Sequence, residues 1–265
     1  MIDGTGVFLH PENPSSLGDD TFWTWFKREF PASRWDWENA KAGDVVLQYS
    51  ALGKYEGQAK YIALCWELYP EMQEKLPRDV GDWSNQVAKC MECAEHTPWR
   101  TVPTEATKHY YRRFGHVEVL PIGIDSELFR PLGRKAELRK QYGVPNGEVG
   151  FWCGTKHRMK GHDLMEDYRR KNPGIFWVLC WKEQSIPQHE LAELMNCADF
   201  VLGTGRLTPM FMVEWEAMSA GLPLRSLTER ELPDGSTRST VLGLGWARLI
   251  ARNGWSRYIQ SVLEA

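Results

Sequence analysis

Short apolar runs alternate along the chain with segments in which apolar residues recur at helical spacing. The apolar runs predict strands at residues 7–10, 44–49, 60–66, 100–103, 118–122, 149–153, 175–179 and 200–202. The helical spacing predicts helices at residues 20–30, 85–96, 105–113, 162–171, 189–196 and 213–220. Strands that alternate with helices are typical of an α/β fold, in which crossover helices join parallel strands.

A charged segment with prolines and glycines, residues 126–146, interrupts this alternation before it restarts. We therefore place a domain boundary near residue 130, which gives domains at residues 1–130 and 131–265. Each domain is expected to be Rossmann-like, with the carboxyl ends of its parallel strands facing a central cleft where ligands bind. Residues 246–263 are expected to form a helix pair that packs on the second domain.

The composition is that of an ordinary globular protein: 265 residues, 42% hydrophobic and 25% charged. A net charge of −3 gives no electrostatic reason to expect binding to nucleic acid or to an anionic membrane. We find neither an apolar run of about 18 residues nor a basic-then-apolar start, so no transmembrane segment or signal peptide is expected. Six cysteines in mainly apolar surroundings suggest reduced core thiols and a cytoplasmic location. The 13 tryptophans enlarge the core, and several are candidates to line a site for a sugar or a base.

Two segments carry the candidate chemistry. GTKHRMKGHDL, residues 154–164, follows a predicted strand and leads into a predicted helix. Such a loop brings backbone N–H groups, a helix N-terminus and Lys160 around one point, which suits a phosphate. VEWEAMSAGLP, residues 213–223, places Glu216 on a helix, and a carboxylate can accept two hydrogen bonds from ribose hydroxyls. Together they predict a site for a nucleoside diphosphate.

Three motifs in this order resemble those of retaining GT-B glycosyltransferases of the family 4 type. VLPIGIDSELFRP is similar to the P-N-G-V-D…F-x-P turn that enters the second domain of that family, and CGTKHRMKGHDLM to its G-R-x-x-x-x-K-G loop. CADFVLGTGRLTPMFMVEWEAMSAGLPL resembles the segment that holds the nucleotide. The agreement covers residues 118–228. The resemblance implies a GT-B fold and metal-independent transfer of a sugar from a nucleotide-diphosphate sugar, such as a UDP-sugar, to an acceptor hydroxyl.

The resemblance also implies roles for individual residues. Lys160 aligns with the lysine that binds the donor diphosphate, and Glu216 with the second glutamate of an E-x7-E pattern, which contacts ribose. Thr155 replaces the family's arginine, and Thr208 replaces the first glutamate of that pattern. Backbone N–H groups around residues 209–212 are then expected to hold the sugar and phosphate. The expected donor site comprises Gly154, Thr155, Lys156, Arg158, Lys160, Thr208, Pro209, Met210, Phe211, Met212 and Glu216.

Candidates for the acceptor side come from the first domain. Glu67 follows a predicted strand directly, at the end where ligands bind, and is expected to act in catalysis together with Lys160. His10 and Gly18 flank the loop HPENPSSLG, which is a candidate to approach the diphosphate. Glu105 follows Thr104 at a helix start, where capping is the simpler interpretation.

No metal or further cofactor is expected, because the donor is a co-substrate. Cys90, Cys93 and His96 form C-x-x-C-x-x-H without a second pair of ligands, so they are interpreted as core residues. Asp36 and Glu38 in WDWE could mimic the acidic metal motif of GT-A enzymes, but they lie in a turn-like stretch rather than at a strand end.

Two alternatives remain open at this point. One is a phage-type transferase that glycosylates hydroxymethylated bases in DNA, with Arg112, Arg113, Lys54 and Lys60 as a local basic patch on the acceptor side. The other is a non-catalytic module that binds nucleotide sugars, which Thr208 supports. The acceptor is accordingly left as a glycan, a small molecule or a modified DNA base.

Overall fold

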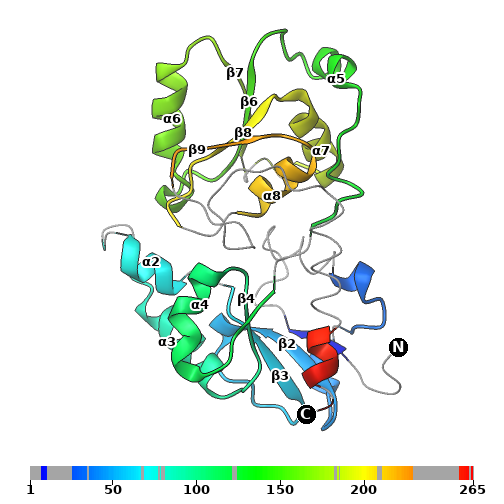
Figure 1. Cartoon of the computed structure of the whole chain (residues 1–265), viewed down its shortest axis with the longest axis vertical. Helices are drawn as coiled ribbons and strands as arrows, with labels where there is room; N and C mark the ends of the chain where they lie inside the picture. The colour runs from blue at the N-terminus through cyan, green and yellow to red at the C-terminus, as the bar shows by residue number, and fades with distance from the viewer. Residues whose placement is uncertain are drawn as a thin grey trace. The chain divides into compact units, whose positions relative to one another are not determined.

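The computed structural model describes residues 7–10, 26–34, 36–66, 69–76, 78, 81–120, 124–181, 184, 186–207, 211–228, 257–262 and 264. They form two compact units, each with its own parallel sheet (Figure 1). Unit 1 contains the described residues up to Leu120 together with those from 257 onward, and unit 2 contains those from Ile124 to Thr228.

The sheet of unit 1 has five parallel strands in the order of the sequence: β1 (Val7–His10), β2 (Val45–Tyr49), β3 (Lys60–Leu64), β4 (Arg100–Val102) and β5 (Glu118–Val119). The connections contain α2 (Tyr69–Lys75), α3 (Ser84–Glu95), α4 (Glu105–Tyr111) and the short 3-10 turns η1 (Trp37–Asn39), η2 (Ser50–Leu52) and η3 (Arg112–Phe114). All five strands fall within predicted segments; β2 and β3 are mainly apolar because they are buried on both faces, whereas β4 and β5 are short and contain Arg100, Thr101 and Glu118.

Helical residues 257–262 pack against unit 1. Ile259 and Val262 are buried in the same cluster as Leu9 and Ile62, on the face of the sheet opposite α3. Lys60 Nζ donates to the carbonyl of Val262 at 3.1 Å. The expectation that the terminal run packs on the second domain is therefore wrong for its described residues, because an apolar pair at i, i+3 finds its partners on the first sheet.

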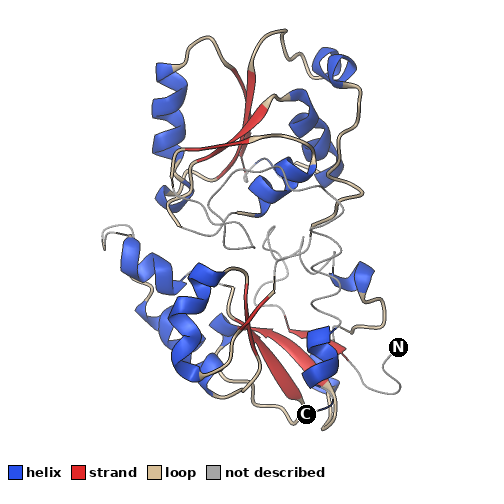
Figure 2. Cartoon of the chain, viewed as in Figure 1, coloured by secondary structure: helices blue, strands red, loops and turns tan. Residues whose placement is uncertain are grey.

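The sheet of unit 2 has the order β7-β6-β8-β9, and all its strands are parallel. The strands are β6 (Val149–Gly154), β7 (Phe176–Trp181), β8 (Phe200–Gly203) and β9 (Leu224–Ser226). The helices are α5 (Lys135–Gln141), α6 (His162–Lys171), α7 (Gln188–Cys197) and α8 (Met212–Ser219), with the 3-10 turn η4 (Arg158–Lys160) before α6. Helices flank this sheet on both sides (Figure 2).

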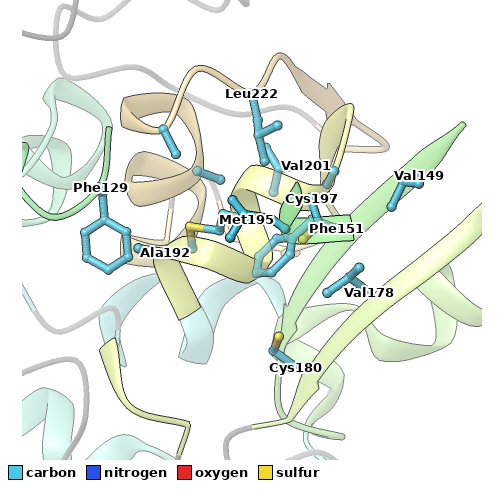
Figure 3. Packing of buried hydrophobic residues seen from close by; sticks show 14 of the residues in the cluster. Phe129, Val149, Phe151, Val178, Cys180, Ala192, Met195, Cys197, Val201 and Leu222 are labelled. Atoms are coloured by element: carbon cyan, nitrogen blue, oxygen red, sulfur yellow. The ribbon is translucent and has the colours of Figure 1, made fainter. Parts of the chain in front are cut away.

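Side chains on these strands alternate between two cores. Phe151 and Val178 pack with Met195 of α7 in a cluster that Figure 3 shows from close by. The intervening Trp152 faces the other way and packs with Met165 of α6. The sheet is thus covered by α6 on one face and by α5, α7 and α8 on the other.

Three elements were not predicted: α2, α5 and β9. Helix α5 lies inside the segment that was interpreted as a linker, and it buries only Leu138, so it has no apolar stripe to reveal it. Strand β9 is an edge strand whose residues are half-buried or exposed, so it is not an apolar run. Both elements are therefore held by tertiary packing, and neither has a periodic apolar pattern that would predict it from the sequence.

The six cysteines are free thiols; five are buried and Cys153 is half-buried, as expected of core residues. None of the helices in the described part of the chain has the length and apolar character needed to cross a bilayer.

Candidate functional site

The topology of unit 2 defines one preferred position for a ligand. Strand β6 connects through α6 to β7 on one side, while β8 connects through α8 to β9 on the other. Helices α6 and α8 cover opposite faces of the sheet. The loops that leave β6 and β8 therefore diverge at their carboxyl ends, which is the switch point where open parallel sheets bind ligands.

The loop after β6 runs from Thr155 to Gly161 and is held close to the end of β8. Gly161 has φ +69°, and a Cβ atom there would lie 1.8 Å from the carbonyl oxygen of Thr204. Only glycine permits this approach and this backbone conformation. The glycine before α6 therefore fixes the loop against the neighbouring strand.

Two polar residues after β8 hold the same loop. Thr204 Oγ1 donates to the carbonyl of Lys160 at 2.7 Å and accepts from Trp152 Nε1 at 2.8 Å. Arg206 donates to the carbonyl of Arg158 at 2.7 Å and makes two hydrogen bonds with Asp163, at 2.7 and 2.6 Å.

The guanidinium of Arg206 also lowers the pKa of Asp163. Sequence reasoning missed Thr204 and Arg206, although polar residues directly after a parallel strand indicate a rim position.

The loop that contains Lys160 lies against the start of the helix that contains Glu216. The pKa of Cys153 is raised to about 12, mainly by burial; the charge of Glu216 also raises it and that of Lys160 lowers it. Lys160 Nζ lies 3.3 Å from the ring centroid of Phe211, at the start of α8. The contact with Phe211 thus places Lys160 at the start of the helix that contains Glu216.

Glu216 is buried, with only 5% of its surface exposed. No described residue makes a hydrogen bond or an ion pair with its carboxyl group. Burial raises its pKa to about 8, so the carboxyl group is mostly protonated at neutral pH. A buried carboxyl group without a partner at a switch point is a typical feature of a binding site.

The first turn of α8 supplies part of the expected amide donors. The amide of Phe211 already donates to Glu214 Oε2 at 2.8 Å, which is the glutamate half of a capping box. Met212 and Val213 come next, and amides in a first turn have no acceptor within the helix. Residues 208–210, which include the predicted Thr208, Pro209 and Met210, lie outside the described residues.

The remaining loop residues of the predicted donor site take other positions. Lys156 is exposed, and its Nζ lies 5.8 Å from the ring centroid of Trp181 at the end of β7. Thr155 Oγ1 accepts from the amide of His157 at 3.3 Å. Gly154 ends β6, and Arg158 is an exposed residue of η4.

On the acceptor side, Glu67 and Gly18 lie outside the described residues, and His10 is the last residue of β1. Thr104 Oγ1 accepts from the amide of Thr107 at 3.3 Å, so Thr104 caps α4. Capping of this helix was expected, and Thr104 provides it.

Three of the four residues proposed as a basic patch on the acceptor side do not lie there; the fourth, Lys54, follows η2 and its Nζ lies 3.6 Å from Glu56. Lys60 begins β3, and Arg112 and Arg113 form η3 just before β5. All three lie toward the amino ends of the strands, whereas ligands bind at the carboxyl ends. The prediction is wrong for these three residues, because α4 returns the chain to the end of the sheet at which the strands begin.

The motifs weighed as metal sites have structural roles. Cys90 and Cys93 are fully buried in the core of unit 1, as predicted, whereas His96 is exposed at the end of α3, so the prediction is wrong for that residue. Asp36 is paired with Arg34, whose Nε donates to it at 2.9 Å. Among the described residues, no group of three or more His, Cys, Asp or Glu side chains is arranged to hold a metal ion.

Comparisons with known proteins bear on the fold. No protein-family model matches the chain, and no curated protein matches it in sequence. Among solved structures, sucrose-phosphate synthase from Thermosynechococcus elongatus is similar over 97% of this chain and 84% of its own, with 15% identity and a TM-score of 0.57.

Anabaena HepE, solved in complex with UDP-glucose, is similar over 97% of this chain and 92% of its own, with 11% identity and a TM-score of 0.58. WaaG, a glycosyltransferase involved in lipopolysaccharide biosynthesis, is similar over 98% and 93%, with 12% identity and a TM-score of 0.53. The predicted GT-B fold, with two parallel α/β units, is confirmed.

Proposed function

We propose that this protein is a retaining, metal-independent glycosyltransferase that uses a nucleotide-diphosphate sugar. The observation that carries the proposal is the position of Lys160 and of the buried Glu216, which has no partner among the described residues, on the loop and the helix that follow β6 and β8 at the switch point of unit 2. A cation beside a buried carboxyl group suits a ligand that has both a phosphate and neighbouring hydroxyl groups.

The chemistry of the transfer assigns a role to each group. As the bond from the sugar to the phosphate breaks, negative charge grows on the nucleoside diphosphate that leaves. Lys160 and the first amides of α8, from Met212 and Val213, are proposed to stabilise that charge, as preorganised donors do without a metal. Glu216 is proposed to bind the ribose hydroxyls. Lys156 and Arg158 supply further positive charge to the same loop.

The acceptor side of the proposal rests on Glu67, with His10 and Gly18 as further candidates. Glu67 is proposed to orient or deprotonate an acceptor hydroxyl. A glycan or a small molecule is the favoured acceptor, because Lys60, Arg112 and Arg113 do not lie at the ligand-binding edge of unit 1.

Donor binding provides the first test, with UDP and UDP-glucose as probes in calorimetry. Lys160→Ala removes one charge-assisted contact and is expected to weaken UDP binding about ten- to a hundredfold. Lys140→Ala removes an exposed lysine from α5 and is the matched control, which should bind UDP like the unchanged protein. Equal UDP affinities in both variants would refute the role of Lys160.

Turnover separates an enzyme from a binding module. Release of UDP from UDP-glucose is followed with water, with glycans and with hydroxymethylated DNA as acceptors. UDP release that Lys160→Ala abolishes and Lys140→Ala leaves unchanged supports the proposal. Tight binding of UDP-glucose without release under any of these conditions would favour the non-catalytic module.

A further inference from the structure

An aromatic group lies at the carboxyl end of β7, beside the loop that contains Lys160. The ring centroid of Trp181 is 5.1 Å from that of Trp152 and 5.4 Å from that of His162, and both contacts are edge-on. Trp152 is only 2% exposed and is fixed by its hydrogen bond to Thr204. Trp181 and His162, in contrast, are only partly buried. The group thus has a rigid base and an accessible edge.

The ring of Trp181 can be reached from the loop side. Lys156 is exposed, yet its ammonium group lies over this ring. The register partner of Trp181 on β6 is Gly154, whose lack of a side chain leaves room for the indole of Trp152 on that side of Trp181. A flat group that replaces the ammonium would therefore meet an aromatic face.

The loop after β6 connects this surface to the proposed diphosphate site. Lys156, which lies over Trp181, and Lys160, which is proposed to bind the diphosphate, belong to this one loop. Strands β6 and β7 are parallel neighbours, about 4.8 Å apart, so the loop and Trp181 lie at the same end of the sheet. A base attached to a nucleotide held by this loop therefore lies at the end of the sheet where Trp181 is accessible.

We propose that Trp181 stacks on the base of the bound nucleotide and that Lys156 leaves the ring to make room for it. This inference rests on the proposed function of the same site. Every nucleobase has an aromatic face, and stacking on an aromatic side chain is favourable for any of them. Trp152 and His162 hold the indole in place by their edge-on contacts.

A purely structural role for Trp181 would give different results, and Trp177 is the matched control. It lies four residues earlier on the same strand and in the same cluster, edge-on to Phe200 at 5.7 Å and to Tyr168 at 5.9 Å. At about 3.3 Å per residue it is roughly 13 Å from Trp181 along the strand. Its replacement tests packing without touching the carboxyl end.

The experiment compares UMP with ribose 5-phosphate, which lacks the base, as competitors of UDP. Trp181→Leu is expected to weaken UMP binding about tenfold or more and to leave ribose 5-phosphate unchanged. Trp181→Phe keeps a ring and should retain most of the difference between the two ligands. Trp177→Leu should leave both affinities unchanged. An unaltered preference for UMP in Trp181→Leu would overturn the proposal and leave the proposed function intact.

Fluorescence gives a readout that does not depend on the stability of the leucine variant. UMP should quench the tryptophan emission of the unchanged protein, and most of that quenching should be absent in Trp181→Phe. Equal quenching in both proteins would overturn the stacking role. If the unchanged protein binds neither UMP nor UDP, the proposed function fails, and the stacking site fails with it.

Discussion

Replacing Glu216 by glutamine is expected to make the protein more stable at neutral pH. Glutamine has the shape of a protonated glutamate but no charge to lose. In the folded protein burial holds the pKa of Glu216 at about 8, against an ordinary value of 4.5. Between these two values the unfolded chain gives up a proton that the folded chain keeps, so folding becomes less favourable as the pH rises.

The magnitude follows from the size of this shift. Each pKa unit corresponds to about 1.4 kcal/mol, so the 2.5 units between pH 4.5 and pH 7 amount to about 3 kcal/mol. Below pH 4.5 both states are protonated, and the difference between Glu216→Gln and the unchanged protein should vanish. Above pH 8 both states are ionised, and the difference should stop growing at about 5 kcal/mol.

Thermal unfolding at pH 4, 5.5, 7 and 8.5 measures this difference. At about 2–4 °C for each kcal/mol, Glu216→Gln should unfold roughly 6–12 °C higher at pH 7 and at the same temperature at pH 4. Glu137→Gln, which changes an exposed glutamate on α5, should show no such trend. A difference for Glu216→Gln that does not change with pH would mean that the carboxyl group is already ionised and satisfied in the folded protein.

Three further predictions concern the loop, the metal and the acceptor side. Gly161→Ala should destabilise the protein by about 2 kcal/mol or more in denaturant unfolding, because its Cβ would strike the carbonyl of Thr204 and its φ is positive. Gly174→Ala, whose Cβ meets nothing within 4 Å, is the control and should change the stability little. Equal losses of stability in the two variants would contradict the close approach of Gly161 to Thr204. UDP release should persist in EDTA, since Lys160 and amides are proposed to meet the charge of the leaving group, and activity that manganese or magnesium restores after chelation would refute this. Glu67→Ala should lower turnover far more than UDP-glucose affinity, as expected of a group that acts in the transition state, and a parallel loss of both in calorimetry and rate assays would place Glu67 in the donor site instead.

The central strands were predictable because burial on both faces makes them mainly apolar runs. Residues 149–153 are an example: Phe151 faces α7 and Trp152 faces α6, so neither face is polar. Helix α5 was missed for the opposite reason. Its contribution to the core is Leu138, and its other residues make polar contacts such as that of Lys135 with Asp199 at 2.9 Å. Polar contacts leave no periodic pattern in a sequence.

The packing of the terminal helix was also beyond the sequence. The spacing of Ile259 and Val262 indicates an apolar helical face, but it does not indicate which sheet that face covers. Because this helix follows the second domain in the sequence, it was expected to pack there. In the structure it is buried against Leu9 of the first domain. Local pattern determines that a face will be buried, and only the complete fold determines where.

The charged residues of the donor site show where sequence reasoning ends. Lys160 was identifiable because a glycine-bounded basic loop between a strand and a helix is a recognisable pattern. Arg206 carries the same charge, but its guanidinium is committed to Asp163 and to the carbonyl of Arg158. Charge type and position along the chain do not separate a cation that braces the loop from one that faces the ligand.

The two glutamates of α8 make the same point more sharply. Glu214 and Glu216 lie two residues apart, so they point to different sides of the helix, and a surface helix would bury at most one of them. Both are buried here, because α8 is enclosed on more than one side. Glu214 is satisfied by the amide of Phe211, whereas Glu216 has no partner among the described residues. A satisfied acid stabilises a helix start, while an unpaired one lowers stability unless a ligand supplies the missing hydrogen bonds. That difference in pairing supports the proposal that Glu216, and not Glu214, binds the ligand.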